Sequence, residues 1–321
     1  MSPKQVIAYC YEGLCNRIDT LIAASFLAKR YKCPLSIFWV DKQLSMDVAV
    51  TDLFSNINCT LLPESEFDTF IKNNSKDIFA MSRNISNIGT YTRLYSCENF
   101  NCNVELEQID NIQQSIIFIQ TCTIPPWCMH YNAIQTFYEY FTIRPELIKP
   151  PLGKIAIHIR GTDMFEDLHI KGASVNKAIE FAKQISIEHP NEKIFICSDD
   201  EEIEKKLKDI SSLFVMFDKS YVHKRDKALT FNNNLDKNGL IYSYSNLDSI
   251  EYNGKEYKNI TQTNMVREKE HVHGAITDLF AMAQVEHLYG YETSRLSTFF
   301  FLASLLKTTR CLPLKKTRQI L

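Results

Sequence analysis

The second half of the chain alternates short apolar runs with longer segments of helical periodicity, and this alternation limits its possible folds most strongly. The run Ile155–Ile159 has the length and composition of a buried strand, and Ile194–Cys197 has them again. Between them, Ser174 is placed to cap a helix that Pro190 would end. The apolar residues of this segment have helical spacing: Val175, Ala178, Ile179, Ala182 and Ile185. Strand, helix and strand in this order predict an α/β fold with a parallel sheet.

The same pattern, less regular, runs through the rest of the chain. The other predicted elements are strands 5–10, 35–40, 116–120, 213–217 and 287–290, helices 16–32, 133–141, 200–210 and 274–286, a helix from about 294, and a hairpin at Asn253-Gly254. With 321 residues the chain has room for two domains. Prolines between 145 and 153 mark a linker, so we predict one α/β domain over 1–150 and another over 151–321. Small-molecule sites tend to lie in the cleft between two such domains.

Charge, glycine and cysteine usage argue against several classes of protein. Lys and Arg total 36 against 38 Asp and Glu, and a net charge of -2 argues against a nucleic-acid partner. The glycines never take the spacing of a dinucleotide-binding or P-loop motif, and the cysteines form no Cys-x-x-Cys pair. No apolar run reaches the ~18 residues of a membrane span, and 6–10 is typical of a strand instead of a signal peptide. We therefore expect a cytoplasmic protein without a transmembrane segment.

Polar residues follow the C-terminal ends of four predicted strands. The four stretches are 12–17, 158–163, 198–200 and 291–295. Ligands of open α/β sheets bind outside the carboxyl ends of the strands. Hydroxyl groups and backbone N–H groups at the start of a helix suit a phosphate. The stretches therefore predict a phosphorylated or nucleotide ligand.

The order of these stretches resembles the motifs shared by α1,2-, α1,6- and protein O-fucosyltransferases. The pattern His-x-Arg-x-x-Asp stands at 158–163, Ser-Asp-Asp at 198–200, and Thr293-Ser294 ends sixteen residues after Asp278. Gly-Leu-Cys-Asn at 13–16 resembles the first-strand loop of the same enzymes. They have a GT-B fold, with two Rossmann-like domains facing a cleft, and need no metal. They transfer L-fucose from GDP-β-L-fucose with inversion at C1.

The resemblance, which covers about 13–306, implies a function for the chain. It would move L-fucose from GDP-β-L-fucose to a hydroxyl group of a glycan or another acceptor. The N-terminal domain would hold the acceptor and the C-terminal domain the nucleotide sugar. The donor is a substrate, and neither a cofactor nor a metal is expected.

The resemblance also implies roles for individual residues. The guanidinium of Arg160 would stabilise the negative charge that grows on the leaving diphosphate, because its fork fits two phosphate oxygens. Asp278 would accept both N–H groups of the guanine edge. The catalytic set would be Arg160, Glu166 and Asp167, and the substrate-binding set Gly13, Asn16, Arg17, His158, Asp163, Asp199, Asp278, Thr293 and Ser294.

Two features depart from the family pattern. Gly161 stands where the α1,2- and α1,6-families have a second arginine, although the protein O-fucosyltransferases also use one arginine here. The class of acceptor therefore stays open. No residue is marked as the general base: Glu166 and Asp167 are the first candidates, and Asp19 is a weaker one.

Each assignment has a structural alternative. His158 could be a satisfied histidine at a strand end, and Arg160 could form a loop salt bridge with Asp163. Asp199-Asp200 could be the acidic start of a helix. Asp278 could be an ordinary helix acid, and Ser294 an N-cap. At the level of function, the alternatives are a related transferase with another nucleotide sugar and a non-catalytic sugar- or nucleotide-binding protein.

Overall fold

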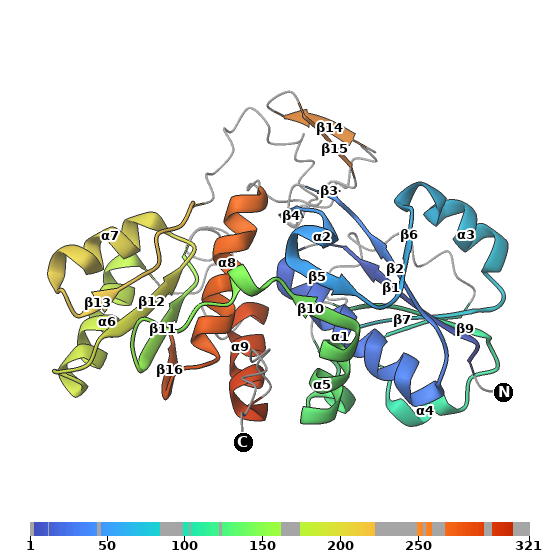
Figure 1. Cartoon of the computed structure of the whole chain (residues 1–321), viewed down its shortest axis with the longest axis horizontal. Coiled ribbons are helices and arrows are strands. Elements are labelled where there is room, and N and C mark those ends of the chain that lie inside the picture. Colours follow the sequence, from blue (N-terminus) through green and yellow to red (C-terminus); the bar gives the residue numbers. More distant parts are fainter. Residues whose placement is uncertain are drawn as a thin grey trace, which may run out of the picture. The chain divides into compact units, whose positions relative to one another are not determined.

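The computed structural model (Figure 1) describes eleven stretches of the chain, and it groups the chain into two compact units. The described residues are 3–11, 13–43, 46–83, 99–102, 104–121, 124–161, 174–221, 249–252, 255–258, 267–291 and 297–310. Unit 1 comprises Met1–Thr142 and His223–Lys269, and unit 2 comprises Ile143–Val222 and Glu270–Leu321. The sequence predicted one boundary near 145–153. In the structure the chain passes between the units at three places, because 223–269 belong with unit 1.

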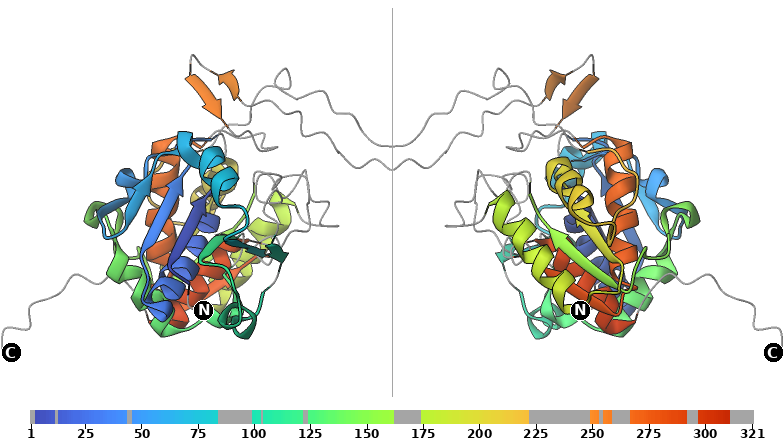
Figure 2. Two further views of the ribbon diagram at one scale, coloured as in Figure 1. Left: turned by 90° about the vertical axis from the view of Figure 1, so that its right-hand side faces the viewer. Right: turned by 90° about the vertical axis from the view of Figure 1, so that its left-hand side faces the viewer.

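Unit 1 is built on a parallel sheet of six strands, ordered β6-β2-β1-β9-β7-β8. Strands of this sheet appear in blue and teal in the left view of Figure 2. In that order the strands are Thr60–Leu62, Leu35–Trp39, Gln5–Cys10, Ile116–Thr121, Ile78–Arg83 and Asn99–Cys102. The register pairs Val6 with Leu35 and Cys10 with Trp39. Strands β1, β2 and β9 are buried almost throughout, as expected for parallel strands covered on both faces.

Helices cover both faces of this sheet. Alternate residues of β1, such as Ile7 and Tyr9, pack with α3 (Phe67–Asn74), while α1 (Leu14–Tyr31) packs with α5 (Tyr131–Tyr140). The remaining elements of this part are short: β3 (Lys42–Gln43), β4 (Met46–Asp47), α2 (Val50–Leu53), β5 (Phe54–Ile57), η1 (Glu64–Glu66), α4 (Leu106–Asp110), η4 (Pro126–Cys128), β10 (Phe141–Ile143), β14 (Ser249–Tyr252) and β15 (Lys255–Lys258). Strands β14 and β15 are antiparallel, which confirms the predicted hairpin.

Unit 2 is built on a parallel sheet of four strands, ordered β13-β12-β11-β16. In that order the strands are Phe214–Val215, Ile194–Ser198, Ile155–Ile159 and His287–Gly290. The helices are η5 (Pro145–Leu147), α6 (Val175–Glu188), α7 (Glu201–Ile210), α8 (Lys269–Met282) and α9 (Thr298–Thr309). Helices α6 and α7 lie on one side of the sheet, and α8 and α9 on the other (Figure 1). The odd-numbered isoleucines of β11 point to the α6 and α7 side, so His158 points to the opposite side.

The predicted cap of α6 is confirmed, and two predicted helix starts are wrong. The Ser174 hydroxyl accepts the Lys177 N–H at the start of α6, and Asp200 caps α7. Helix α8 begins at Lys269 instead of Gly274. Helix α9 is capped by Ser297, whose hydroxyl accepts the Phe300 N–H, so its start lies beyond Ser294.

The apolar run at the start of α9 is only partly buried. Phe301 is 40% exposed, whereas Leu302 and Leu306 are buried.

Among the described residues no helix is both long and apolar enough to cross a membrane.

Candidate functional site

The parallel register of unit 2 brings the described parts of three predicted motif stretches, 158–161, 198–200 and Tyr291, to one edge of the sheet. His158 of β11 is level with Cys197 of β12 and with Gly290 of β16. The N–H of Tyr291 donates to the carbonyl oxygen of His158 at 3.0 Å, which extends this alignment past the strand ends. Arg160 follows β11 at the same edge and is partly exposed. Ligands of open parallel sheets bind at this edge, so it is the candidate site of unit 2.

His158 is held as a neutral, buried imidazole. Its ring stacks on Phe299 and Phe300 of α9, with centroids 5.3 and 5.8 Å away. Gly290 leaves room for this arrangement, because a Cβ there would lie 2.8 Å from the ring of Phe300. Burial lowers the pKa of His158 to about 3, and the positive charges of Arg160 and Lys219 act in the same direction. The positive charge at this strand end is therefore that of Arg160 and not of His158.

The lowered pKa of His158 gives the fold a specific pH dependence. The unfolded chain binds a proton at His158 below about 6.5, and the folded chain does not do so until about 3. The contribution of this residue to stability is therefore fully present above pH 6.5 and is lost as the pH falls through that window. We expect the stability difference between wild type and His158→Gln to fall by up to about 1.4 kcal/mol per pH unit between pH 6 and 4. Urea titrations at each pH measure it, and a pH-independent difference would contradict it.

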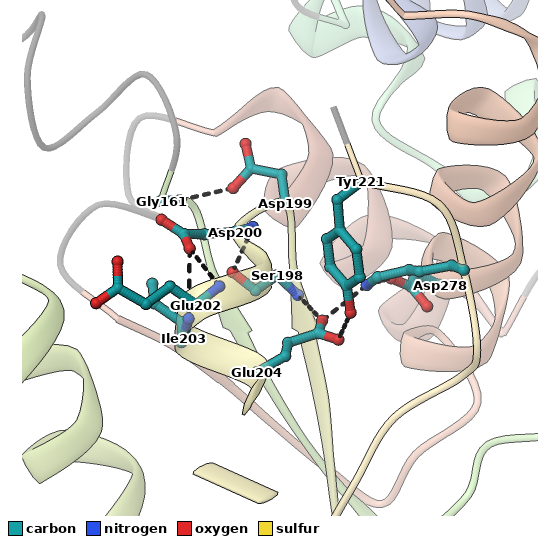
Figure 3. Close-up of polar contacts among 10 residues, drawn as sticks. Gly161, Ser198, Asp199, Asp200, Glu202, Ile203, Glu204, Tyr221 and Asp278 are labelled. Atoms are coloured by element: carbon teal, nitrogen blue, oxygen red, sulfur yellow. Dashed lines mark hydrogen bonds and ion pairs between the residues drawn. The ribbon is translucent and has the colours of Figure 1, made fainter. Parts of the chain in front are cut away.

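Gly161 is packed against the start of α7. Its N–H donates to the Asp199 carboxylate at 2.7 Å (Figure 3), and Asp199 therefore ties the end of β11 to the end of β12. Asp200 caps α7 by accepting the N–H groups of Glu202 and Ile203. A Cβ at Gly161 would lie 2.5 Å from the Cβ of Asp200. The position where the α1,2- and α1,6-fucosyltransferase motif has a second arginine thus has no room for a side chain here. The alternative prediction, that Asp199-Asp200 stands at the acidic start of a helix, agrees with the start of α7.

A buried cluster of charges, here called the Lys219 cluster, lies in the same unit. It consists of Glu204 on α7, Asp278 on α8, and Lys219 and Tyr221 in the segment after β13 (Figure 3). The Lys219 ammonium lies 2.8 Å from Glu204 Oε1 and 2.6 Å from Asp278 Oδ2, and all three side chains are at most 7% exposed. The Tyr221 hydroxyl donates to Glu204 Oε2, and the Ser198 N–H donates to Glu204 Oε1.

The sequence indicated Asp278 but neither Glu204 nor Lys219. Glu204 stands in the highly charged segment 201–209, which is typical of a solvated helix face. Its spacing, one residue from Ile203 and three from Leu207, nevertheless places it on the apolar side of α7. Lys219 has no such signal, because it lies in a segment without regular structure.

Asp278 is bound differently from the two-donor contact that the resemblance implied. One oxygen, Oδ2, is taken by Lys219. The other, Oδ1, is buried and has no hydrogen-bond partner in the described part of the chain. Burial raises the pKa of Asp278 to about 6, although the positive charge of Lys219 acts against this rise.

In unit 1 the predicted site residues Gly13 and Asn16 lie at the start of α1. Gly13 is the N-cap residue, and no side chain caps this end of the helix. A Cβ at Gly13 would meet nothing within 4 Å, so the backbone here is open to close approach. The carbonyl oxygen of Asn16 accepts the Thr20 hydroxyl.

Two other residues of α1 lie in the core of unit 1. The Arg17 guanidinium is fully buried and donates to the carbonyl oxygens of Val40 and Met46, at 2.7 and 3.2 Å. It also lies 4.7 Å from the centre of the Trp39 ring. Arg17 thus holds β2 and β4 to α1 and presents no exposed surface to a substrate.

Asp19, the weaker candidate for a general base, is also fully buried. Neither carboxyl oxygen has a well-oriented hydrogen bond within the described stretches, although the backbone N–H of Ile124 lies nearby. Burial raises the pKa of Asp19 well above its usual range. Burial therefore favours the neutral form of this carboxyl and shields it from an acceptor in solution.

Five predicted site residues lie outside the described residues: Asp163, Glu166, Asp167, Thr293 and Ser294. Their roles stay predictions, as does the alternative salt bridge between Arg160 and Asp163. In the described stretches no group of three or more His, Cys, Asp or Glu side chains could hold a metal ion.

Comparison with known proteins identifies the fold. No family model matches the chain, and no curated protein matches its sequence. The fucosyltransferase NodZ from Bradyrhizobium aligns over 94% of this chain and 92% of its own, with a TM-score of 0.52 and 12% identity. The chain has a GT-B fold. A structure of NodZ α-1,6-fucosyltransferase soaked with GDP-fucose aligns over 95% of this chain and 92% of its own, with a TM-score of 0.52 and 13% identity.

A plant enzyme gives the same result. A mutant of Arabidopsis thaliana FUT1, in complex with GDP, aligns over 95% of this chain and 68% of its own, with a TM-score of 0.51 and 11% identity. The chain thus resembles GT-B fucosyltransferases along nearly its whole length, which confirms the predicted α/β class and the two Rossmann-like parts. At such low identity the similarity shows the fold and not the reaction.

Proposed function

We propose that this protein is a glycosyltransferase that moves L-fucose from GDP-β-L-fucose to an acceptor hydroxyl, with inversion at C1. The observation that carries the proposal is the convergence of His158, Arg160 and Asp199 at the carboxyl edge of the unit 2 sheet. These residues belong to the motifs that resemble those of fucosyltransferases. The GT-B fold supports the same reading, since GDP and GDP-fucose are bound by structures with which the chain aligns.

Arg160, a partly exposed residue, carries a guanidinium that suits the leaving diphosphate. In the proposed reaction the acceptor oxygen attacks C1, the bond from C1 to the diphosphate oxygen breaks, and GDP leaves with that electron pair. Negative charge grows on the diphosphate as the bond breaks, so a fixed guanidinium stabilises the transition state more than the bound donor. Because His158 is neutral, it adds no second positive charge and leaves this role to Arg160.

The acceptor proton needs a general base in this scheme. Glu166 and Asp167 remain the candidates, since they follow the His-x-Arg motif closely in sequence. Asp19 is set aside because its carboxyl is buried in unit 1. Gly13 and Asn16 are proposed to contact the acceptor or the phosphate, and Arg17 is withdrawn from that set because its guanidinium is used in the core.

A donor panel tests the proposal directly. The protein is incubated with GDP-fucose, GDP-mannose, UDP-glucose and UDP-N-acetylglucosamine, each with a set of glycan acceptors and with EDTA present. We expect GDP release and an α-fucosylated product from GDP-fucose alone. Turnover of another donor would support the related transferase, and nucleotide or glycan binding without turnover would support the non-catalytic binding protein.

A further inference from the structure

Helix α7 has one charged side chain among its buried residues. Ile203 and Leu207 pack into the core of unit 2, and Glu204, which lies between them in sequence, is 1% exposed. Replacing a buried ion pair by apolar residues of similar volume is often neutral or stabilising. Stability alone therefore does not explain why a glutamate stands at this position, and its contacts indicate another role.

Glu204 holds the turn between β12 and α7 (Figure 3). Its Oε1 accepts the N–H of Ser198 at 2.9 Å, so at the last residue of β12 the acceptor is a side chain instead of a strand carbonyl group. The Ser198 hydroxyl in turn accepts the N–H of Asp200 at 3.1 Å. Together these two bonds fix the backbone on both sides of Asp199.

Asp199 connects this turn to the strand end that carries Arg160. Its Oδ1 accepts the N–H of Gly161 at 2.7 Å, and Gly161 directly follows Arg160 in the chain. The two segments are also packed tightly, because a Cβ at Gly161 would lie 2.5 Å from the Cβ of Asp200. A shift of the turn at 198–200 must therefore move the backbone beside Arg160.

Two further donors hold the Glu204 carboxylate in place. The Lys219 ammonium lies 2.8 Å from Oε1, and the Tyr221 hydroxyl donates to Oε2. Burial acts to lower the pKa of Lys219, but Asp278 and Glu204 raise it above its usual value, so the ammonium keeps its charge. Three donors on two oxygens leave the carboxylate one orientation, as a group that positions others requires.

We propose that Glu204 is a positioning residue for Arg160: by accepting the Ser198 N–H it fixes the turn at 198–200, and this turn, through Asp199 and the Gly161 N–H, fixes the backbone that carries the guanidinium. The inference rests on the proposed function, because it takes Arg160 as the group that stabilises the leaving diphosphate. Glu204 is buried and acts through these contacts, not on a substrate.

The proposed role predicts which kinetic constant depends on Glu204. The guanidinium of Arg160 stabilises the transition state more than the bound donor, and a misplacement of about 1 Å can cost roughly 100-fold in rate. Loss of its placement should therefore appear mainly in kcat, with the KM for GDP-fucose within about threefold of wild type.

The experiment compares two replacements of Glu204. Glu204→Gln keeps an oxygen that can accept the Ser198 N–H, whereas Glu204→Met has a similar volume and no such acceptor. We expect kcat with GDP-fucose to fall by roughly tenfold or more in Glu204→Met and by less than about threefold in Glu204→Gln. Glu202→Met is the matched control, because this glutamate of the same helix pairs with Lys206 on the surface, and its kcat should stay within about twofold of wild type.

Two further measurements separate positioning from a merely structural role. If Glu204 acts through Arg160, Glu204→Met should lower kcat by less than about twofold in a protein that already carries Arg160→Lys. Independent structural losses would multiply instead. Amide exchange at Gly161, followed by NMR, needs no turnover, and we expect it to quicken by roughly tenfold or more in Glu204→Met and by less than about threefold in Glu204→Gln.

The other outcomes contradict the inference or the proposed function separately. Multiplying losses, unchanged exchange at Gly161, or an equal loss of kcat in Glu204→Gln would reject the positioning role and leave the proposed function intact. If wild type turns over no donor, the proposed function fails, and exchange at Gly161 alone decides whether Glu204 fixes the turn. Should Glu204→Met not fold, Tyr221→Phe replaces it in both measurements, with an expected loss of kcat of about two- to fivefold that disappears in the Arg160→Lys background.

Discussion

Replacing Arg160 by lysine is expected to lower turnover by roughly 100-fold or more, the scale of losing one transition-state hydrogen-bond donor. Lysine keeps the charge but loses the planar fork that binds two phosphate oxygens at once. Because Arg160 is partly exposed at the end of β11, the fold should tolerate the change, with a melting temperature within about 2 °C of wild type. Initial rates with GDP-fucose and a thermal melt of the same preparation measure both effects.

Arg30→Lys provides the matched control. Arg30 on α1 also uses its fork, with Nε and a terminal nitrogen 3.1 and 2.7 Å from the two oxygens of Asp110. That pair is on the surface, where loss of bidentate geometry costs at most about 1 kcal/mol and touches no proposed substrate contact. Equal fractional losses of rate and stability in Arg160→Lys would indicate a structural salt bridge and count against the proposed catalytic role.

The core elements of unit 2 were predictable because they obey simple periodicities. Strand β11 has the bounds given by its apolar run, and β16 has the bounds predicted for it. Helix α6 follows from its apolar stripe and from Ser174. In each case burial against a sheet requires a contiguous or regularly spaced set of apolar side chains, and the sequence shows that set directly.

The short elements of unit 1 gave no comparable signal. Strand β6 at the sheet edge has only exposed or half-buried residues, so neither apolar alternation nor an apolar run marks it. Helix α3 has eight residues, of which Phe67 and Ile71 alone are buried. Such elements are stabilised by their place beside longer strands, which local sequence does not encode.

The sequence likewise predicted some parts of the candidate site and missed others. Its position at the strand ends follows from the general rule for parallel sheets, and His158, Arg160 and Asp199 were found in this way. The Lys219 cluster was not, because it depends on contacts between α7, α8 and the segment after β13, which are far apart in sequence. The sequence also did not predict the burial of Arg17. An arginine one helical turn after a glycine is as compatible with contact to a ligand as with a place in the core.

Gly161→Ala is expected to destabilise unit 2 by about 1–3 kcal/mol, the usual cost of forcing a methyl group into a filled space. The new Cβ would lie 2.5 Å from the Cβ of Asp200 and 3.1 Å from Cδ1 of Ile203, and neither atom is the end of a long flexible side chain. Relief of the clash must move the N-cap of α7 or lengthen the bond from the Gly161 N–H to Asp199, and both hold the loop that carries Arg160. Turnover should therefore fall as well. Gly161→Arg should be worse, and should not recreate a second phosphate-binding arginine.

Gly13→Ala is the matched control. It replaces a glycine as Gly161→Ala does, but without a steric clash, so the difference between the two variants measures the effect of the clash. A Cβ at Gly13 meets nothing within 4 Å, and the residue has an extended backbone with a φ of -73°, so alanine fits there. Urea unfolding of Gly13→Ala should differ from wild type by less than about 1 kcal/mol. If Gly161→Ala lowered the free energy of unfolding no more than Gly13→Ala does, the start of α7 would move without loss of stability. The contact with Asp200 would then not explain why glycine stands beside Arg160. If both variants kept wild-type stability but only Gly161→Ala lost turnover, the glycine would be needed for space around the bound diphosphate.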